Sequence, residues 1–323
     1  MARVISVESE RFPIAGTFTI SRGSKTEAEV VTVTIREHGR SGRGECVPYK
    51  RYGETIEGVR DAIEAMRERI AGGISRAALL DAMPAGAARN AVDCALWDLE
   101  AKITGKPVAS SICTAPPRAL ETAYTLSLGE PEAMAAQARA NALRPLLKVK
   151  IGGDNDMARI RAVREAAPAS RIILDANEGW SDDNIVANLA FAAEHGIALI
   201  EQPLPAGRDG ILRNIAHPVP ICADESVHEA KDLASLVGLY DAVNIKLDKS
   251  GGLTAALVLR DRARELGFGV MVGTSLAMAP AVLLAQDGDF VDLDGPLLLA
   301  RDRAPGLVYQ GSLVSPPDTA LWG

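Results

Sequence analysis

The chain has 323 residues, of which 47% are hydrophobic and 24% charged, and its formal net charge is -7. This length suits one large α/β domain or two domains, and the composition is that of a globular protein. Nucleic acids and anionic membranes attract basic patches, so the negative charge disfavours both as partners. The four cysteines lie far apart without a CxxC pair, and the start MARVISVESERF has no signal-peptide core. We therefore expect a cytoplasmic protein with reduced thiols, no targeting segment and no membrane span.

Residues 1–118 predict an α+β capping domain. Strand-like stretches at 3–14, 18–23 and 29–39 are separated by glycine-containing turns, which is typical of an antiparallel meander. Helical patterns come next, near 55–71 and 87–104, and the second of these has a strongly apolar face. The sequence TAPP at 114–117 is a plausible linker to the second part of the chain.

Residues 119–300 have a different, repeating pattern. Short apolar runs begin at 122, 146, 171, 197, 219, 242, 269 and 290, and segments with helical spacing lie between several of them. Alternation of strands and helices indicates parallel pairing, because a crossover helix joins parallel strands. Eight such runs favour an α/β fold with a (β/α)₈-type barrel over an open sheet, although their number alone does not prove closure. We expect residues 301–323 to pack back on the capping domain.

Charged side chains follow the apolar runs at their carboxyl ends, where the functional groups of such barrels collect. One acid after a strand is often only the N-cap of the next helix, but carboxylates after three consecutive runs would require several coincidences. The charged residues at these positions are Lys148, Lys150, Asp175, Glu201, Asp224, Lys246, Asp292 and Asp294.

Three carboxylates that converge at a barrel mouth repel one another, and a cation relieves this repulsion. Ligands that are all oxygen favour Mg²⁺, whereas zinc prefers histidine or cysteine. The four histidines do not sit at strand ends in an HxH arrangement. The sequence therefore predicts a magnesium site and argues against a zinc-dependent hydrolase.

Lys148 and Lys150 in the stretch LKVKIGG share one face of a strand, because side chains alternate with a period of two. Taken alone, the stretch fits an edge strand with its charged face in water. In a barrel, however, Lys246 on the sixth strand faces the second strand across the mouth. Burial, a neighbouring ammonium and a dication lower a lysine pKa from about 10.4 toward about 7 to 8. Two opposed bases around a metal suit removal of a proton α to a carboxylate and its return to the opposite face.

The motifs KVK, LDAN, EQPLP, ADES and NIKLDKSGGL together resemble the enolase superfamily, in its muconate-lactonizing subgroup. The resemblance covers nearly the whole chain, including GECVPYKRYGE and NAVDCALWDLEAK. It implies Lys150 and Lys246 as the two acid/base catalysts, with Lys148 supporting an enolate. It also implies three Mg²⁺ ligands, Asp175, Glu201 and Asp224.

Within this subgroup the sequence most resembles the dipeptide epimerases, specifically the L-Ala-D/L-Glu epimerases of murein peptide recycling. The acidic pair in VDLDG, Asp292 and Asp294, carries this likeness, because the family binds the free amino group of the dipeptide with such a pair. In FTISRGSKTEAE, Arg22 and Lys25 are two candidate cations for a substrate side-chain carboxylate. Thr125 in YTLSL resembles a family binding position, although threonine is also simply a good strand former.

Several alternatives remain open. N-acyl amino acid racemisation, o-succinylbenzoate synthesis and muconate cycloisomerisation share the enolate intermediate, but their substrates offer no ammonium to the acidic pair. A metal-dependent hydrolase on the same barrel, and a barrel kept only as a scaffold, are further interpretations without a positive feature. The stretch GTSLAMAPA departs from the pattern of the resembled relatives, which bears on side-chain preference. The oligomeric state is open and includes a homo-oligomer; the expected partner is a small-molecule dipeptide.

Overall fold

The computed structural model describes residues 3–273 and 278–323. Its first part is an antiparallel three-stranded sheet in the order β1–β2–β3, against which helices pack. The first two predicted strand-like stretches merge into β1, with an irregular register between Pro13 and Phe18. The elements of this part are β1 (Val4–Ile20), β2 (Gly23–Glu37), β3 (Arg40–Cys46), η1 (Lys50–Tyr52), α1 (Ile56–Glu64), α2 (Arg67–Ala71), α3 (Arg76–Ala82), α4 (Ala87–Thr104) and α5 (Ala109–Ile112).

Helix α4 connects this sheet with the rest of the molecule. It is buried on nearly every side, because β3 packs on one face and the helices α10 (Leu247–Ser250) and α11 (Leu253–Glu265) on another. The contact with β3 is so close that a Cβ atom added at Gly44 would overlap the backbone of Ala91 and lie 2.6 Å from the nitrogen of Ala95. Glycine at this position therefore lets the capping sheet sit directly on the helix.

The described part of residues 119–300 forms an eight-stranded sheet in which all neighbouring strands are parallel. Every one of the eight apolar runs predicted from the sequence contributes one strand. The strands are β5 (Tyr124–Leu126), β6 (Leu146–Lys150), β7 (Arg171–Asp175), β8 (Leu199–Glu201), β9 (Ile221–Ala223), β10 (Ala242–Ile245), β11 (Gly269–Gly273) and β12 (Phe290–Asp292).

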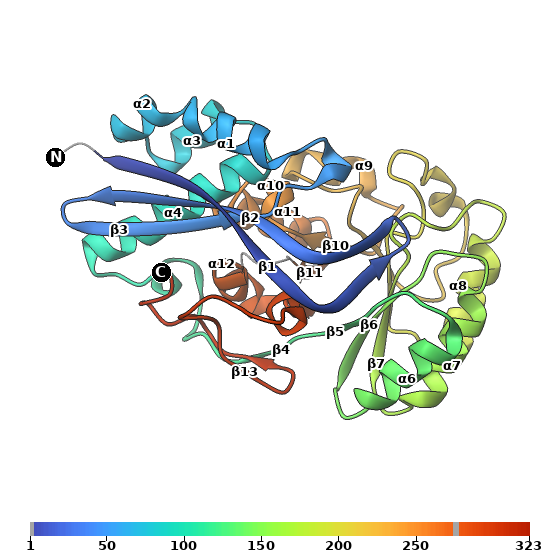
Figure 1. The fold of residues 1–323 in the computed structure, drawn as a ribbon. Coiled ribbons are helices and arrows are strands. Elements are labelled where there is room, and N and C mark those ends of the chain that lie inside the picture. Colours follow the sequence, from blue (N-terminus) through green and yellow to red (C-terminus); the bar gives the residue numbers. More distant parts are fainter. Residues whose placement is uncertain (1–2, 274–277) are drawn as a thin grey trace.

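Helices and short 3₁₀ turns connect these strands and cover the outside of the sheet (Figure 1). A 3₁₀ turn rather than an α-helix follows β8 and β12, so the strand–helix repeat is incomplete at these two places. The connecting elements are α6 (Pro131–Ala140), α7 (Asp156–Ala166), α8 (Ile185–Glu194), η2 (Gly210–Asn214), η3 (Ala230–Asp232), α9 (Leu233–Leu236), α10 (Leu247–Ser250), α11 (Leu253–Glu265), α12 (Met278–Leu284), η4 (Ala285–Asp287) and η5 (Gly295–Leu298).

Hydrogen bonds join the two outer strands of the sheet. Just before β5, Ala123 donates its N–H to the carbonyl of Val291 in β12, at 2.8 Å. Next to it, the N–H of Leu293 donates to the hydroxyl of Thr122, at 2.7 Å. The sheet is thus nearly closed, and the predicted (β/α)₈-type barrel with a separate N-terminal domain is confirmed as the fold class.

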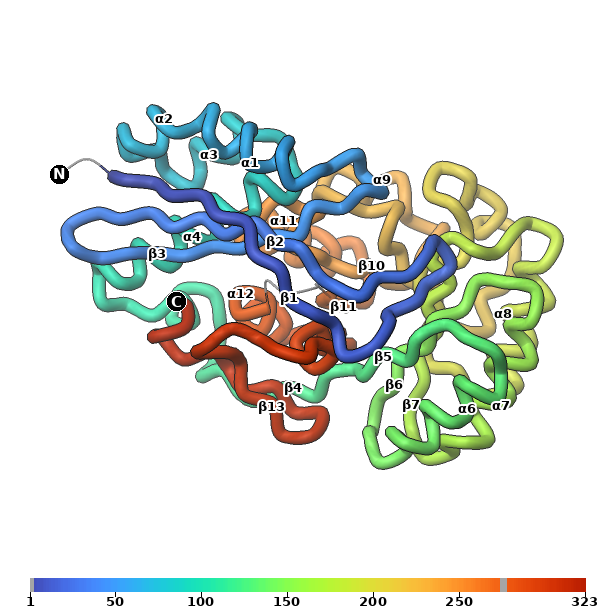
Figure 2. The backbone as a smooth tube through the Cα atoms, in the orientation of Figure 1, coloured from blue at the N-terminus to red at the C-terminus, as the bar shows by residue number. Residues whose placement is uncertain are grey.

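The last residues of the chain contact both parts of the molecule (Figure 2). The indole N–H of Trp322 donates to the carbonyl of Cys94 in α4, at 3.1 Å, and Arg303 contacts Glu45. The division of the chain at residues 118 and 300 stays a prediction. Short strands pair antiparallel in the order β13 (Tyr309–Gln310), β14 (Leu313–Val314) and β4 (Leu120–Glu121).

None of the helices in the described ranges has the length and apolar character needed to cross a membrane.

The long β1–β2 hairpin leaves the capping sheet and crosses the mouth of the barrel (Figures 1 and 2). Leu128, just after β5, donates its N–H to the carbonyl of Thr19, at 3.0 Å, and Ala300 donates to the carbonyl of Pro13, at 2.8 Å. The tip of the hairpin therefore lies over the carboxyl ends of the barrel strands.

Candidate active site

The barrel interior has an apolar layer beneath a polar one. Because side chains alternate along a strand, the residue two positions after each apolar interior residue faces the interior again, nearer the carboxyl end. The apolar layer consists of Ala123, Leu146, Ile173, Leu199, Cys222, Ala242 and Met271, with Phe290 packed against them. The polar side chains two positions further along are Thr125, Lys148, Asp175, Glu201, Asp224, Asn244 and Asp292.

Lys148 lies at the centre of the polar layer. Its Nζ is 3.1 Å from Asp175, 2.6 Å from Glu201 and 2.7 Å from Asp292, and its side chain is only 2% exposed. Burial disfavours the charged ammonium, but attraction to the three carboxylates outweighs it and raises the pKa of Lys148 well above its usual value. The alternative of an edge strand with lysines in water is wrong, because β6 lies between β5 and β7.

Lys150 and Lys246 flank the carboxylates from two sides. Lys150 Nζ lies 2.5 Å from Asp175, and Lys246 Nζ lies 2.5 Å from Asp224 and 3.8 Å from Glu201. The lowered pKa expected for these lysines is not found for Lys246. Burial lowers its pKa, but the carboxylates of Asp224 and Glu201 raise it well above the usual value.

The predicted metal ligands Asp175, Glu201 and Asp224 lie at the ends of β7, β8 and β9, which are neighbours in the sheet. Burial and the neighbouring Asp175 raise the pKa of Glu201 to about 7, so a second negative charge is unfavourable here. Its Oε2 is buried without a regular hydrogen bond, although Lys148 Nζ is 2.6 Å away. A divalent cation fits this crowded, all-oxygen donor set.

In the present side-chain arrangement, lysine ammoniums lie between these carboxylates. Lys148 bridges Asp175 and Glu201, and Lys246 pairs with Asp224. No group of three or more His, Cys, Asp or Glu side chains within residues 3–273 and 278–323 is therefore arranged around one point as a metal site. The predicted ligands match Mg²⁺ in residue type and in strand position.

Asp292, at the end of β12, lies beside Lys148, and Asp294 lies beside Thr125. Oδ2 of Asp292 contacts Lys148, whereas its Oδ1 is buried without a hydrogen bond from any described residue. Asp294 Oδ2 accepts the N–H of Thr125 at 2.6 Å, and burial together with Asp292 raises the pKa of Asp294 to about 7. The pair thus has one buried acceptor available to an additional donor.

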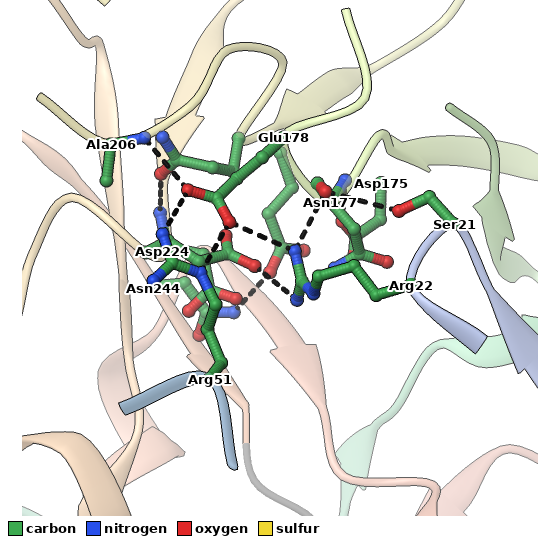
Figure 3. A network of polar contacts seen from close by, with 12 residues as sticks. Ser21, Arg22, Arg51, Asp175, Asn177, Glu178, Ala206, Asp224 and Asn244 are labelled. Carbon is green, nitrogen blue, oxygen red and sulfur yellow. Dashed lines mark hydrogen bonds and ion pairs between the residues drawn. The ribbon is translucent and has the colours of Figure 1, made fainter. Parts of the chain in front are cut away.

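The two candidate cations of the hairpin differ in position. Arg22 reaches the barrel, where its Nη1 donates to the carbonyl of Asn177 and its Nη2 to Glu225, each at 2.8 Å (Figure 3). Lys25 lies on β2 opposite Phe18, is exposed, and forms no ion pair with any residue in the described ranges. Of the two, Arg22 is the one that meets the site.

The charged residues of this region that sequence reasoning missed include Glu178, Arg51 and Lys249. Arg51 on η1 holds Glu178 with two hydrogen bonds of 2.8 Å. The fully buried Nζ of Lys249 lies 2.5 Å from Asp224 Oδ1. The motifs that contain them, PYKRYGE, LDANE and NIKLDKSGG, were visible, but nothing local indicates that these side chains turn toward the barrel mouth.

Comparison with known proteins identifies the family. The model of the mandelate racemase / muconate lactonizing enzyme N-terminal domain matches residues 2–112, and that of the enolase C-terminal domain-like family matches residues 132–291. The chain is 44% identical over 313 residues to L-Ala-D/L-Glu epimerase from Escherichia coli (strain K12), covering 95% of this chain and 98% of that protein. The chain belongs to the enolase superfamily. The predicted family and its fold are confirmed.

This enolase-superfamily protein is also 44% identical to N-acetyl-D-glutamate racemase from Pseudoalteromonas sp., over 91% of this chain and 95% of the relative. Both curated relatives are epimerases or racemases, so the predicted isomerase class is confirmed. These two relatives are equally similar to the chain, at 44% identity, but they are named for different substrates. The choice of substrate must therefore be argued from the site.

Two solved structures bear on ligands of the superfamily. An enolase family member from Agrobacterium tumefaciens with homology to dipeptide epimerases, with bound sodium and L-Ala-L-Glu, is 60% identical; it covers 99% of this chain and 100% of its own, with a TM-score of 0.98. A dipeptide epimerase from Cytophaga hutchinsonii complexed with Mg and D-Ala-L-Val is 29% identical and covers 98% and 94%, with a TM-score of 0.91. Superfamily relatives thus bind magnesium or sodium together with dipeptides. The stretch GTSLAMAPA falls partly in residues 274–277, outside the described residues.

Proposed function

We propose that this enolase-superfamily protein is a dipeptide epimerase that inverts the α-carbon of the C-terminal residue in L-Ala-L/D-Glu-type dipeptides. The observation that carries the proposal is the placement of two lysines on opposite flanks of a row of carboxylates. Lys150 pairs with Asp175 on β7 and Lys246 with Asp224 just after β9, each at 2.5 Å, and Glu201 lies on the strand between. A substrate α-carbon held over this row has a proton carrier on each face.

Lys150 and Lys246 are the proposed proton carriers. One of them, in its neutral form, takes the α-proton, and the other, as an ammonium, delivers a proton to the opposite face. Reversing these roles converts the other epimer, so each lysine serves as base for one stereoisomer. The buried ammonium of Lys148 stays charged beside the reacting carboxylate and favours the negative charge that develops there.

Asp175, Glu201 and Asp224 are the proposed holders of Mg²⁺. The ion, when bound, supplies positive charge that stabilises the enolate formed from the substrate carboxylate. The support in this chain is the all-oxygen donor set on three adjacent strands and the raised pKa of Glu201, to about 7.

Asp292 and Asp294 are the proposed site for the free amino group of the dipeptide, with Thr125 holding Asp294. The available Oδ1 of Asp292 supports an ammonium ligand, since a buried carboxylate oxygen without a donor is unfavourable. Arg22 is the proposed partner of the substrate side-chain carboxylate, and its position over the barrel favours it over Lys25. We further propose that the protein acts in the cytoplasm on peptides released from murein.

The second candidate is racemisation of an N-acyl amino acid such as N-acetylglutamate, which the relative from Pseudoalteromonas favours. Its substrate carries the same side-chain carboxylate but no ammonium. The buried acidic pair favours the dipeptide, because an N-acetyl methyl group satisfies neither carboxylate.

One experiment separates the two. The protein is incubated with Mg²⁺ in D₂O, in parallel with L-Ala-L-Glu and with N-acetyl-L-glutamate, and the α-proton is followed by NMR. We expect loss of the Glu α-proton signal with appearance of the D-epimer of the dipeptide, at a higher kcat/KM than for N-acetylglutamate. Higher kcat/KM for N-acetylglutamate would favour the racemase. Absence of exchange with a panel of dipeptides would contradict the epimerase proposal.

Replacing Asp292 by asparagine is expected to raise KM for L-Ala-L-Glu by about tenfold to a hundredfold, equivalent to about 1.4 to 2.8 kcal/mol. The amide keeps the size of the side chain but loses the charge that pairs with the substrate ammonium. Mg²⁺ affinity, measured by calorimetry, is expected to change far less than KM. The matched control is Asp287→Asn on η4, before the start of β12. Equal losses of dipeptide and Mg²⁺ binding in Asp292→Asn would argue against the ammonium role.

A further inference from the structure

The carboxylate of Glu178 joins four separate segments of the chain (Figure 3). It follows β7, and its Oε1 accepts from Arg51 Nη2 at 2.8 Å and from the N–H of Ala206 at 2.9 Å. Its Oε2 accepts from Arg51 Nε at 2.8 Å and from Arg22 Nη1 at 3.2 Å. The side chain is 9% exposed, so this acid is nearly buried and fully engaged.

The backbone around Glu178 is held in an unusual conformation. Asn177 and Glu178 have φ angles of +44° and +67°, in the left-handed region that non-glycine residues rarely adopt. The same turn presents the carbonyl of Asn177, which accepts from Ser21 Oγ at 3.2 Å and from Arg22 Nη1 at 2.8 Å. The turn thus directs both a carboxylate and a carbonyl toward the hairpin tip.

Arg22 and Arg51 come from different parts of the capping domain, the β1–β2 turn and η1, and both meet Glu178. Arg51 neutralises Glu178 by a two-pronged contact, the geometry in which arginine binds a carboxylate most strongly. Glu225, buried beside Asp224, holds the other end of the Arg22 guanidinium. Arg22 is therefore held in place by Glu178 and Glu225. Because Glu178 also pairs with Arg51, Glu178 alone does not neutralise the charge of Arg22.

We propose that Glu178 is a positioning residue for substrate selection: it fixes Arg22 over the barrel mouth so that dipeptides with an acidic C-terminal residue are preferred, and Arg51 acts through it. This inference rests on the proposed function, in which Arg22 receives the substrate side-chain carboxylate. Glu178 and Arg51 contact no group assigned to proton transfer, so their effect is on selection rather than on the chemical step.

Charge acts in the opposite direction to positioning here. Removing the negative charge of Glu178 alone makes the surroundings of Arg22 more positive, which favours an acidic substrate. Replacing Glu178 and Arg51 together by neutral residues leaves the net charge unchanged, removes the contacts of Arg51 and takes the charge from the contact between residue 178 and Arg22. The double variant Arg51→Met/Glu178→Gln therefore isolates positioning from charge.

The test compares α-proton exchange of L-Ala-L-Glu with that of L-Ala-L-Gln, in which a neutral amide replaces the side-chain carboxylate. We measure the ratio of the two kcat/KM values in the wild type, Glu178→Gln, Arg51→Met and the double variant. The control is Glu29→Gln, which removes an exposed partner of Arg11 elsewhere on the same hairpin. Arg22→Met serves as the reference for the direct contact.

We expect the ratio to fall about fivefold to tenfold in the single and double variants, mainly through KM for L-Ala-L-Glu, as suits loss of charged hydrogen bonds. The kcat values and the L-Ala-L-Gln parameters are expected to stay within about twofold, and Glu29→Gln to match the wild type. The Arg51 side chain is 42% exposed. We therefore expect Arg51→Met to fold even if Glu178→Gln does not.

Four results would overturn the inference. Equal losses for both dipeptides would make Glu178 a general structural residue. A higher ratio in Glu178→Gln with an unchanged ratio in the double variant would make it only a competing charge. An unchanged ratio in Arg22→Met would overturn this inference together with the assignment of Arg22. A lowered ratio in Arg22→Met, with unchanged ratios in the Glu178 and Arg51 variants, would overturn this inference alone.

Discussion

Replacing Lys150 by alanine is expected to abolish epimerisation while leaving α-proton exchange in one of the two stereoisomers. The remaining Lys246 can still take a proton from its own face and return a deuteron there, but nothing replaces the carrier on the other face. Loss of a positioned general acid or base typically lowers the rate by about 10²- to 10⁴-fold. The measurement is NMR in D₂O, started separately from L-Ala-L-Glu and from L-Ala-D-Glu.

The reciprocal variant Lys246→Ala is expected to retain exchange only in the other stereoisomer. Lys231→Ala removes a lysine whose side chain is 76% exposed and pairs with Glu229, and this variant is expected to behave as the wild type. Exchange of both stereoisomers at the wild-type rate in Lys150→Ala would rule out the two-base assignment. The two-base assignment would also be ruled out if both lysine variants lost exchange in the same stereoisomer.

Replacing Glu201 by glutamine is expected to remove most of the stabilisation that Mg²⁺ gives the folded protein. An ion that binds only the folded state raises the free energy of unfolding by about 2.7 kcal/mol at a concentration a hundred times its Kd. Glu201 supplies the middle carboxylate of the row and is completely buried, so its neutral amide leaves two charges to hold the ion. The measurement is Tm with and without MgCl₂ at constant ionic strength, and epimerisation is expected to fall in parallel.

The matched control is Glu265→Gln, an exposed acid on α11 that pairs with Arg262 on the outside of the barrel. Its Mg²⁺-dependent increase in Tm is expected to equal that of the wild type. An unchanged increase in Glu201→Gln would show that the ion binds elsewhere, and the metal assignment would then be wrong.

Much of the barrel could be predicted from the sequence, because each strand is marked by its own residues. The run LLKVK is buried along its whole length, and the period of two that puts Leu146 in the interior also puts Lys148 and Lys150 there. The same rule places Asp175, Glu201 and Asp224 inside. Closure of the sheet could not be predicted, because it depends on hydrogen bonds between residues far apart in sequence, such as Ala123 and Val291.

The parts that could not be predicted involve partners from distant segments. Glu178 and Arg51 are 127 positions apart, and either one in isolation has the pattern of a solvated loop charge. Lys249 was missed for a similar reason, since a lysine in a short helix is usually exposed, yet this one is buried against Asp224. The pKa of Lys246 was expected to fall through burial, a neighbouring ammonium and a dication, whereas in this structure the carboxylates of Asp224 and Glu201 raise it.

The β1–β2 hairpin contributes neither a barrel strand nor a proposed proton carrier, yet its tip supplies Arg22. In the proposed function, selection of the substrate side chain and inversion at its α-carbon therefore depend on separate stretches of the chain. Evolution, or a protein engineer, can exchange the hairpin tip together with its anchor Glu178 and leave the lysines of β6 and the end of β10 untouched. A change of dipeptide preference would then require substitutions at the hairpin tip and in the turn after β7, whereas the proposed proton carriers would stay the same.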